Sequence, residues 1–249
     1  MLEILITVDD LNWERNENFM SYLYLIKYRK DGPLIFISHL DLSQLLRRVL
    51  MRAGIPVEWT QGFNPRIKAS FGPALPLGLE GWQEITEIAL KEPLEGVALK
   101  DRINEVAPNG FAIVEVEQVL DKNLTLSKLL KKAIYLIYLV PKDSMDLKKM
   151  VYFLEIIEND IRFILNQKEI KTEKVNKKGL QEIDLRPFIH DMTIFSKSCD
   201  RIIILLVQNI IAGGLVNPNL IMDRLFCNIM ELFSIEKIIR EKFINELPV

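Results

Sequence analysis

Hydrophobic and polar residues follow two different periods along the first 120 residues of the chain. Four segments alternate with the period of two that is typical of strands: 21–29, 67–71, 83–90 and 111–119. Residues 38–53 and 99–106 instead place apolar side chains three and four positions apart, as amphipathic helices do. The predicted order of elements in this half is therefore β-α-β-β-α-β.

Local signals mark both ends of the longer helix. Ser38 and Asp41 fit a capping box at its start, and Gly54 fits the position that commonly follows a helix end. In the strand at 111–119, three side chains are expected to point into the core: Ala112, Val114 and Val116.

The β-α-β-β-α-β order is that of the ferredoxin-like split βαβ, an antiparallel sheet with two helices on one face. Residues 133–249 repeat this order more loosely. We expect a helix from Asp143 to about Asn159 and a second helix that Asn217 and Pro218 begin. Strands are expected near 133–140, 161–167, 180–187, 201–208 and 235–244, and the region 169–200 holds more strand-like sequence than the pattern requires. The predicted fold class is α+β, with tandem ferredoxin-like (βαββαβ) domains and antiparallel sheets.

The pattern also divides the chain. We expect an N-terminal extension at 1–19, a first ferredoxin-like domain at 20–120, a polar linker at 121–132 and a second α+β domain at 133–249. The longest apolar runs are far shorter than the roughly 20 residues that span a bilayer. The first ten residues lack the features of a signal peptide. The sequence predicts a cytoplasmic protein without a membrane segment.

Charge is distributed unevenly, although the net charge is only −2. Residues 20–79 carry eight cations and three anions, a local +5, whereas residues 80–120 carry three cations and nine anions, a local −6. This asymmetry indicates an anionic partner on one side of the first domain. Alternatively, the two segments neutralise each other in the folded protein.

The stretch TQGFNPRIKASFGPALPLG, residues 60–78, is the main candidate binding loop. Gly62 can supply a positive φ, and Asn64 is held extended by Pro65, so the loop is expected to be rigid. Two cations, Arg66 and Lys68, follow directly, which suits an anionic or polar planar ligand. The alternative is a rigid connection with solvated cations.

The helix before this loop has a basic face, since Arg48 and Arg52 are four residues apart and Arg47 is adjacent. We expect Arg48, Arg52, Arg66 and Lys68 to line one cleft, with His39 near them. The complete set of candidate ligand-binding residues is Ser38, His39, Asp41, Arg48, Arg52, Gln61, Phe63, Asn64, Arg66 and Lys68.

Evidence for catalysis is sparse. His39 could serve as a general acid or base in metal-free RNA cleavage, but no partner base or nucleophile is visible, and a histidine in a first helical turn more often makes a polar contact. The chain has two cysteines and two histidines, too scattered for a zinc site or an iron–sulfur cluster, so we expect no metal and no cofactor. Three tyrosines of the first strand could stack on bases or pack in the core: Tyr22, Tyr24 and Tyr28.

Three stretches resemble a family of radical SAM-linked uncharacterised bacterial proteins, which occur beside or fused to a radical SAM protein: FISHLDLSQLLRR, RAGIPVEWTQGFNPR and SFGPALPLG. The resemblance covers about residues 20–120 and extends to IDLRPFI at 183–189 and to GLVNP at 214–218. It implies a bacterial protein in a nucleic-acid or modification setting and implies no known reaction. The chain lacks the CxxxCxxC cluster ligands of the fused form, so it cannot itself cleave S-adenosylmethionine.

Three functions are consistent with these residues. The first is a non-catalytic accessory protein that presents a structured RNA or another anionic substrate, working with a radical SAM enzyme. The second is a subunit that docks on a radical SAM protein, and the third is an RNA endonuclease that uses His39. The basic segment favours the first, whereas the acidic sequence pI of about 5.9 favours the second.

Overall fold

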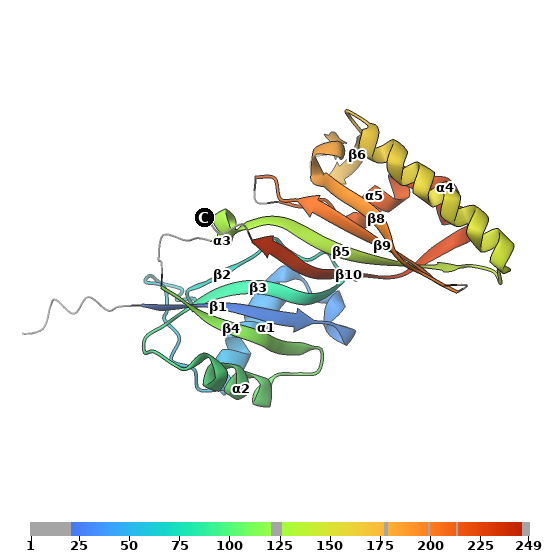
Figure 1. The fold of residues 1–249 in the computed structure, drawn as a ribbon. Helices are drawn as coiled ribbons and strands as arrows, with labels where there is room; N and C mark the ends of the chain where they lie inside the picture. The colour runs from blue at the N-terminus through green and yellow to red at the C-terminus, as the bar shows by residue number, and fades with distance from the viewer. Residues whose placement is uncertain (1–20, 121–125, 177–178, 199, 213, 246–249) are drawn as a thin grey trace, which may run out of the picture.

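The computed structural model describes residues 21–120, 126–176, 179–198, 200–212 and 214–245. The protein is a mixed α+β structure built on one large, mostly antiparallel sheet of eight strands. Figure 1 shows the sheet running through both halves of the chain, with helices packed against it. The predicted extension at 1–19 and the first part of the predicted linker lie outside the described residues.

Every element predicted for the N-terminal half is present. The elements are β1 (Tyr22–Lys30), α1 (His39–Arg52), β2 (Ala69–Phe71), β3 (Glu80–Leu90), α2 (Gly96–Val106) and β4 (Phe111–Val119), with a 3-10 helix at Gly32–Phe36. The strands pair in the order β4-β1-β3, and β2 pairs with β3, all antiparallel. Both helices pack on one face of these strands (Figure 1), where they bury an apolar cluster.

The ends of α1 follow the predicted signals. The Asp41 amide donates to Ser38 Oγ at 3.2 Å, and the Ser38 amide donates to Asp41 Oδ2 at 3.3 Å, which completes the capping box. Gly54 has a φ of 62°, a left-handed conformation that is strained for other residues. From α2, Arg102 donates to the carbonyls of Ala53 and Gly54 at 3.0 and 2.7 Å.

One prediction for β4 was wrong. Ala112 and Val114 are exposed, whereas Ile113 is buried. The pairing of β1 with β4 shifts register between Lys27 and Tyr28. A bulge of this kind reverses the side on which the following side chains point, so only the later part of β4 follows the predicted alternation.

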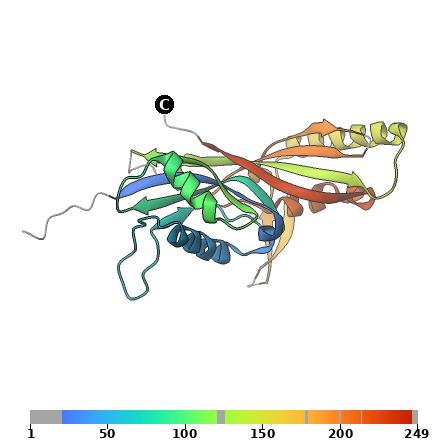
Figure 2. The same cartoon turned by 90° about the horizontal axis from the view of Figure 1, so that it is seen from below.

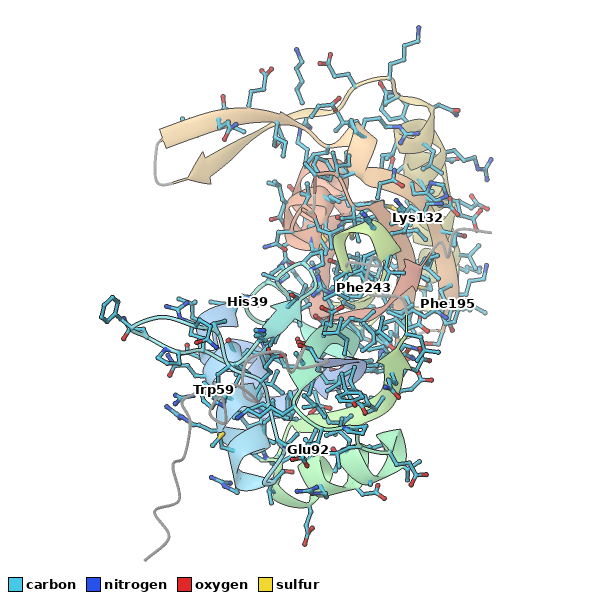
Figure 3. The ribbon with its side chains drawn as sticks, turned by 90° about the vertical axis from the view of Figure 1, so that its left-hand side faces the viewer. His39, Trp59, Glu92, Lys132, Phe195 and Phe243 are labelled. Carbon is cyan, nitrogen blue, oxygen red and sulfur yellow. The ribbon has the colours of Figure 1, made fainter. Side chains whose placement is uncertain are left out.

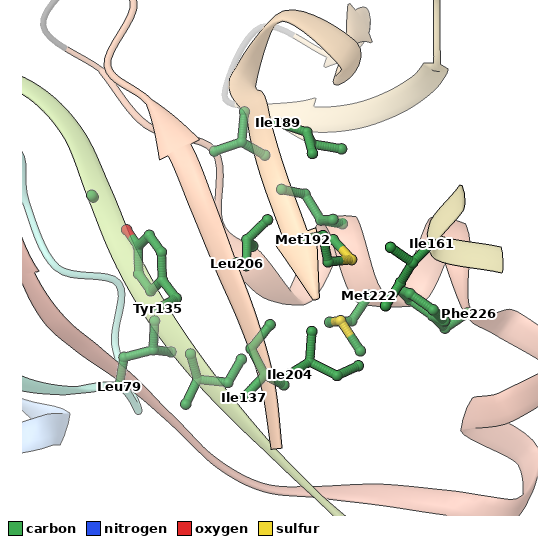
Figure 4. Packing of buried hydrophobic residues seen from close by; sticks show 14 of the residues in the cluster. Leu79, Tyr135, Ile137, Ile161, Ile189, Met192, Ile204, Leu206, Met222 and Phe226 are labelled. Atoms are coloured by element: carbon green, nitrogen blue, oxygen red, sulfur yellow. The ribbon is translucent and has the colours of Figure 1, made fainter. Parts of the chain in front are cut away.

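The C-terminal half contains α3 (Leu126–Leu129), β5 (Leu130–Pro141), α4 (Leu147–Asn166), β6 (Lys171–Asn176), β7 (Gly179–Asp184), β8 (Ile189–Lys197), β9 (Ile202–Asn209), α5 (Pro218–Leu225), α6 (Cys227–Leu232) and β10 (Phe233–Asn245), with a 3-10 helix at Arg186–Phe188. Its strands pair in the order β10-β5-β9-β8, whereas β6 and β7 form a separate hairpin. Helices α4, α5 and α6 bury the larger apolar cluster against these strands. Figure 4 shows Ile137 and Ile204 from the sheet facing Met222 and Phe226 from this helical layer.

Several boundaries in this half differ from the prediction. The helix expected to end near Asn159 continues to Asn166, so the strand expected at 161–167 is absent. The buried residues of this helix keep the helical spacing through Ile161 and Ile164. A short apolar run such as this one fits a buried strand as well as a buried helix, so the sequence pattern alone does not distinguish the two. Asp146, rather than Asp143, caps this helix by accepting from the Lys149 amide at 2.8 Å. Residues 126–132 of the expected linker form α3 and the start of β5.

A short parallel pairing joins the two halves, because Ile239 and Arg240 of β10 pair with Glu80 and Gly81 of β3. The halves therefore share one continuous sheet, and tandem ferredoxin-like domains are not confirmed. None of the described helices is long and apolar enough to cross a membrane, and the cytoplasmic location stays a prediction.

Candidate nucleic-acid interface

Residues 57–68 form a hairpin that we call the finger. Trp59 and Ile67 form an antiparallel bridge, the Thr60 amide donates to the Arg66 carbonyl at 2.7 Å, and the Arg66 amide donates to Thr60 Oγ1 at 3.0 Å. The Glu58 amide donates to the Ala89 carbonyl of β3 at 2.8 Å, which attaches the finger to the sheet. Figure 2 shows the finger projecting from the body of the protein on the side that carries α1.

The tip of the finger is a bend that presents an aromatic side chain. Gly62 has a φ of 125°, as the sequence predicted, in a region that L side chains rarely adopt. Gln61 and Asn64 are exposed on either side, and Phe63 is completely exposed, at 106 % relative accessibility. The whole ring of Phe63 is therefore accessible to a partner.

Lys68 is occupied within the finger. Its ammonium forms an ion pair with the carboxylate of Glu58, which also accepts from the Ser21 hydroxyl. Burial raises the pKa of Glu58, but these hydrogen bonds outweigh that effect and leave the pKa below its ordinary value. The predicted ligand contact from Lys68 would therefore have to replace an existing ion pair.

The cations of α1 point in different directions. Arg47 packs over the ring of Trp59, with its guanidinium carbon 5.4 Å from the ring centroid, so it joins the helix to the finger. Arg52 faces α2, where it donates to the Val106 carbonyl at 3.5 Å. Arg48 lies between them in sequence and is exposed.

Pairing of the other charges leaves unpaired positive charge on α1 and the finger. Lys27 pairs with Glu115 at 2.5 Å, Arg29 pairs with Asp31, and Lys30 is buried and donates to the Ile37 carbonyl. Four arginines of α1 and the finger form no ion pair with any residue that the structure describes: Arg47, Arg48, Arg52 and Arg66. The local excess of positive charge seen in the sequence thus collects on α1 and the finger.

His39 does not share a cleft with Arg52. It is the first residue of α1 and stacks edge-on against Phe71 at 5.2 Å between ring centroids. Thirteen residues separate it from Arg52 at the last position of the helix, which corresponds to about 20 Å along the axis. Figure 3 shows His39 and Trp59 at separate places on this side of the protein. The expected cleft that would contain both His39 and Arg52 is therefore wrong, and the assignment of these residues to a ligand stays a prediction.

Other predicted residues have structural partners. Ser38 and Asp41 bind each other in the capping box, and Ser38 Oγ also lies 2.7 Å from Asp41 Oδ2. Tyr24 and Tyr28 are buried, the first bonded to Leu94 and the second stacked 5.4 Å from Phe111. These tyrosines pack in the core and do not form a stacking surface for bases.

A buried polar cluster at the junction of the two halves was not predicted. Arg240 is fully buried and donates from Nε to Glu84 Oε1 at 2.6 Å and from Nη2 to the Pro73 carbonyl at 2.7 Å. The Tyr135 hydroxyl lies 3.5 Å from Arg240 Nη1. Glu84 and Arg240 are 156 residues apart, and neither lies in a motif, so no local signal could have paired them.

The described residues contain no group of three or more histidine, cysteine, aspartate or glutamate side chains arranged to hold a metal ion. Cys199 lies outside the described residues.

The family model described as "Uncharacterized protein conserved in bacteria (DUF2344)" matches residues 23–218. This match carries no link to a radical SAM enzyme, and that link stays a prediction. No curated protein matches the chain.

Three solved structures have a similar backbone. A Cbf5-Nop10-Gar1 complex matches with a TM-score of 0.47 and 9 % sequence identity, over 88 % of this chain and 48 % of the matched chain. The archaeal box H/ACA sRNP Nop10-Cbf5 complex matches with a TM-score of 0.42 and 10 % identity, over 89 % and 48 % of the two chains. An H/ACA RNP bound to a substrate RNA containing 2'-deoxyuridine matches with a TM-score of 0.44 and 8 % identity, over 88 % and 47 %. The chain spans about half the length of the chains it matches, and similarity at this level carries no functional argument.

Proposed function

We propose that the chain, which belongs to this family of uncharacterised bacterial proteins, is a non-catalytic accessory protein that binds a structured RNA through α1 and the finger. The observation that carries the proposal is the presence on α1 and the finger of four arginines without ion-pair partners among the described residues, together with the fully exposed Phe63 at the tip of the finger.

The two kinds of side chain have complementary roles. The arginines supply charge for phosphate oxygens, and a guanidinium binds two of these oxygens at once. Phe63 offers a ring on which an unpaired base of a loop or bulge can stack. Gln61 and Asn64 flank this ring with amides that can donate to or accept from a base edge. The pairing of basic and aromatic groups favours RNA with unpaired bases over a simple polyanion.

Binding is better supported than catalysis. His39 makes no hydrogen bond with any residue that the structure describes, and its ring contacts Phe71. Among the described residues no hydrogen-bond partner orients this imidazole, as partners orient the base in known nucleophile–base pairs. RNA cleavage by His39 therefore remains the weaker hypothesis.

The arrangement of strands supports our interpretation of the halves as related ferredoxin-like units. When the hairpin of β6 and β7 is set aside, each half runs strand, helix, strand, strand, helical segment, strand. The observed orders, β4-β1-β3-β2 and β10-β5-β9-β8, then place equivalent strands in equivalent positions.

A second function, docking on a protein such as a radical SAM enzyme, is favoured by a different surface. Phe36, Leu40 and Leu77 are exposed near the start of α1, and the Gly78 amide donates to the Ile35 carbonyl at 2.9 Å, which brings their segments together. The sequence resemblance to radical SAM-linked proteins is what suggests the identity of this partner.

Fluorescence anisotropy with a labelled RNA hairpin at several salt concentrations tests the RNA proposal. Arg48→Ala and Arg66→Ala should each weaken binding and reduce the slope of log K against log salt by about 0.7–0.9 for every phosphate that the variant no longer neutralises. Phe63→Ala should weaken binding by about 1–3 kcal/mol with an unchanged slope, because stacking releases no counterion.

Arg162→Ala is the matched control, since Arg162 is an exposed arginine on α4, remote in sequence from the finger. This variant should bind as the unmodified protein does. Equal losses of affinity in all three arginine variants would show a diffuse charge effect, and unchanged binding in Phe63→Ala and Arg66→Ala would refute the interface.

A further inference from the structure

A groove of about 470 Å³ opens at the base of the finger. Its volume is within the range of about 300–1,000 Å³ that is typical of small-molecule sites. Leu23 and Ala89 are paired neighbours on β1 and β3 and form its apolar floor. They lie on the opposite face of the sheet from Tyr24 and Ile88, which pack with α1 and α2. The floor of the groove thus lies on the opposite face of the sheet from α1.

The polar groups of this groove come from the finger, β2 and β3. Thr60 and Ser70 contribute hydroxyl groups, and Lys68 contributes an ammonium that is already paired with Glu58. Glu87 contributes a carboxylate that is partly buried. The site therefore combines an apolar floor with hydrogen-bonding groups at its edge, as small-molecule sites do.

Glu87 differs from the other buried or half-buried carboxylates of the sheet. Glu58 has Lys68 and Glu84 has Arg240, whereas Glu87 forms no ion pair and no side-chain hydrogen bond with any described residue. Burial raises its pKa, which reflects incomplete solvation of the charged form. A ligand that donates hydrogen bonds to both carboxylate oxygens would replace the missing solvation.

We propose that this groove binds one unstacked guanine base of the RNA, with the Glu87 carboxylate accepting from guanine N1–H and the N2 amino group. The inference rests on the proposed RNA-binding function and names the base that the protein reads. Guanine suits an ionised carboxylate because its Watson–Crick edge places two donors side by side. Adenine, cytosine and uracil each place an acceptor next to their donor on that edge, and this acceptor would face a carboxylate oxygen.

The test uses four labelled RNA hairpins that differ only in one loop position, which is G, A, C or U in an otherwise all-U loop. The hairpin with G should bind about tenfold more tightly than the other three, the discrimination expected of a bidentate contact. Glu87→Gln should remove this preference, because the amide has only one acceptor oxygen in place of two. Glu92→Gln, the same change at an exposed carboxylate outside the groove, should keep the preference.

Free guanosine provides a second readout that does not depend on RNA binding. Guanosine, and not adenosine, should shift the amide resonances of Leu23 and Ala89 in the unmodified protein but not in Glu87→Gln. Hairpins that bind through the arginines without a preference for G would overturn the guanine site and leave the proposed function intact. If no hairpin binds, the proposed function fails, and the absence of guanosine shifts would then reject the groove as well.

Discussion

At Gly62 the backbone adopts a φ of 125°, and a Cβ built there meets no atom within 4 Å. The conformation, and not crowding, therefore demands glycine. Because Phe63 follows directly, the direction of its ring depends on this one backbone angle.

We expect Gly62→Ala to lower the free energy of unfolding by about 1 kcal/mol, through strain at a dihedral that alanine rarely adopts. RNA affinity should fall as well, since the turn that presents Phe63 changes shape. Chemical denaturation and anisotropy measure the two effects.

Gly78→Ala is a suitable comparison, because Gly78 also has a positive φ, of 83°, and has no atom within 4 Å of an added Cβ. It should cost similar stability and leave RNA affinity unchanged. A Gly62→Ala protein with normal affinity would show that the shape of the tip does not matter for binding.

Side-chain positions were predictable only where a local rule applied. The capping box of Ser38 and Asp41 and the positive φ of Gly62 follow from residue type and spacing, and both are observed. His39 and Arg52 do not group together, because the rise of α1 places its first and last residues far apart although they are near in sequence. The pairing of Lys68 with Glu58 was missed because it depends on how the finger folds back on itself.

The C-terminal end of helix α4 is capped by an arginine from another segment of the chain. Arg186 donates to the carbonyls of Leu165, Gln167 and Ile189 at 2.9, 3.0 and 2.6 Å. Two of these carbonyls belong to the end of α4, where backbone acceptors lack helical partners. The side chain of Asp184 fixes the segment by accepting from the Ile170 and Arg186 amides. This network gives the IDLRPFI motif a structural role.

Arg186→Ala should lower the free energy of unfolding by about 3 kcal/mol or more, because it removes three charged donors and leaves partly buried carbonyls unpaired. Arg186→Lys should recover only part of that stability, since a single ammonium cannot reproduce the fork of a guanidinium. Urea denaturation of both variants measures the difference. Equal stability of the alanine and lysine variants would show that the forked geometry is unimportant.

Element order in the N-terminal half was predictable because each strand and helix there has a clear period and a terminating signal. In the C-terminal half, the spacing of the isoleucines in the last part of α4 is compatible with a helix and with a strand. Packing against the sheet is what determines the helix. The bulge between Lys27 and Tyr28 was likewise hidden, since it arises from pairing with a strand distant in sequence.

The two halves are held together by the buried pair of Glu84 and Arg240 in addition to the short parallel ladder of β3 and β10. Burial lowers the pKa of Arg240, but the neighbouring Glu84 carboxylate raises it and the net pKa is above its ordinary value. The guanidinium therefore stays charged. Its bond to the Pro73 carbonyl places the segment after β2 in this junction. Such a pair depends on the complete fold and leaves no trace in local sequence.

Arg240→Ala should lower the free energy of unfolding by about 3–5 kcal/mol, because it leaves Glu84 buried without a counter-ion. Replacing both partners, as Glu84→Leu with Arg240→Met, should restore most of this stability, since no charge then remains buried. Urea denaturation measures both effects.

Lys242→Ala, a change at an exposed cation of the same strand, is the control and should change the free energy of unfolding by no more than about 0.5 kcal/mol. A double variant as unstable as Arg240→Ala would argue that packing, and not charge, dominates this junction.

The separation of Glu84 and Arg240 also sets an order of events during synthesis. Arg240 follows Glu84 by 156 positions, which the ribosome covers in roughly 8–30 s at about 5–20 residues per second. Throughout this interval the nascent N-terminal half lacks the arginine that neutralises its buried carboxylate. That half therefore reaches its final form only after β10, the last strand described, has been made.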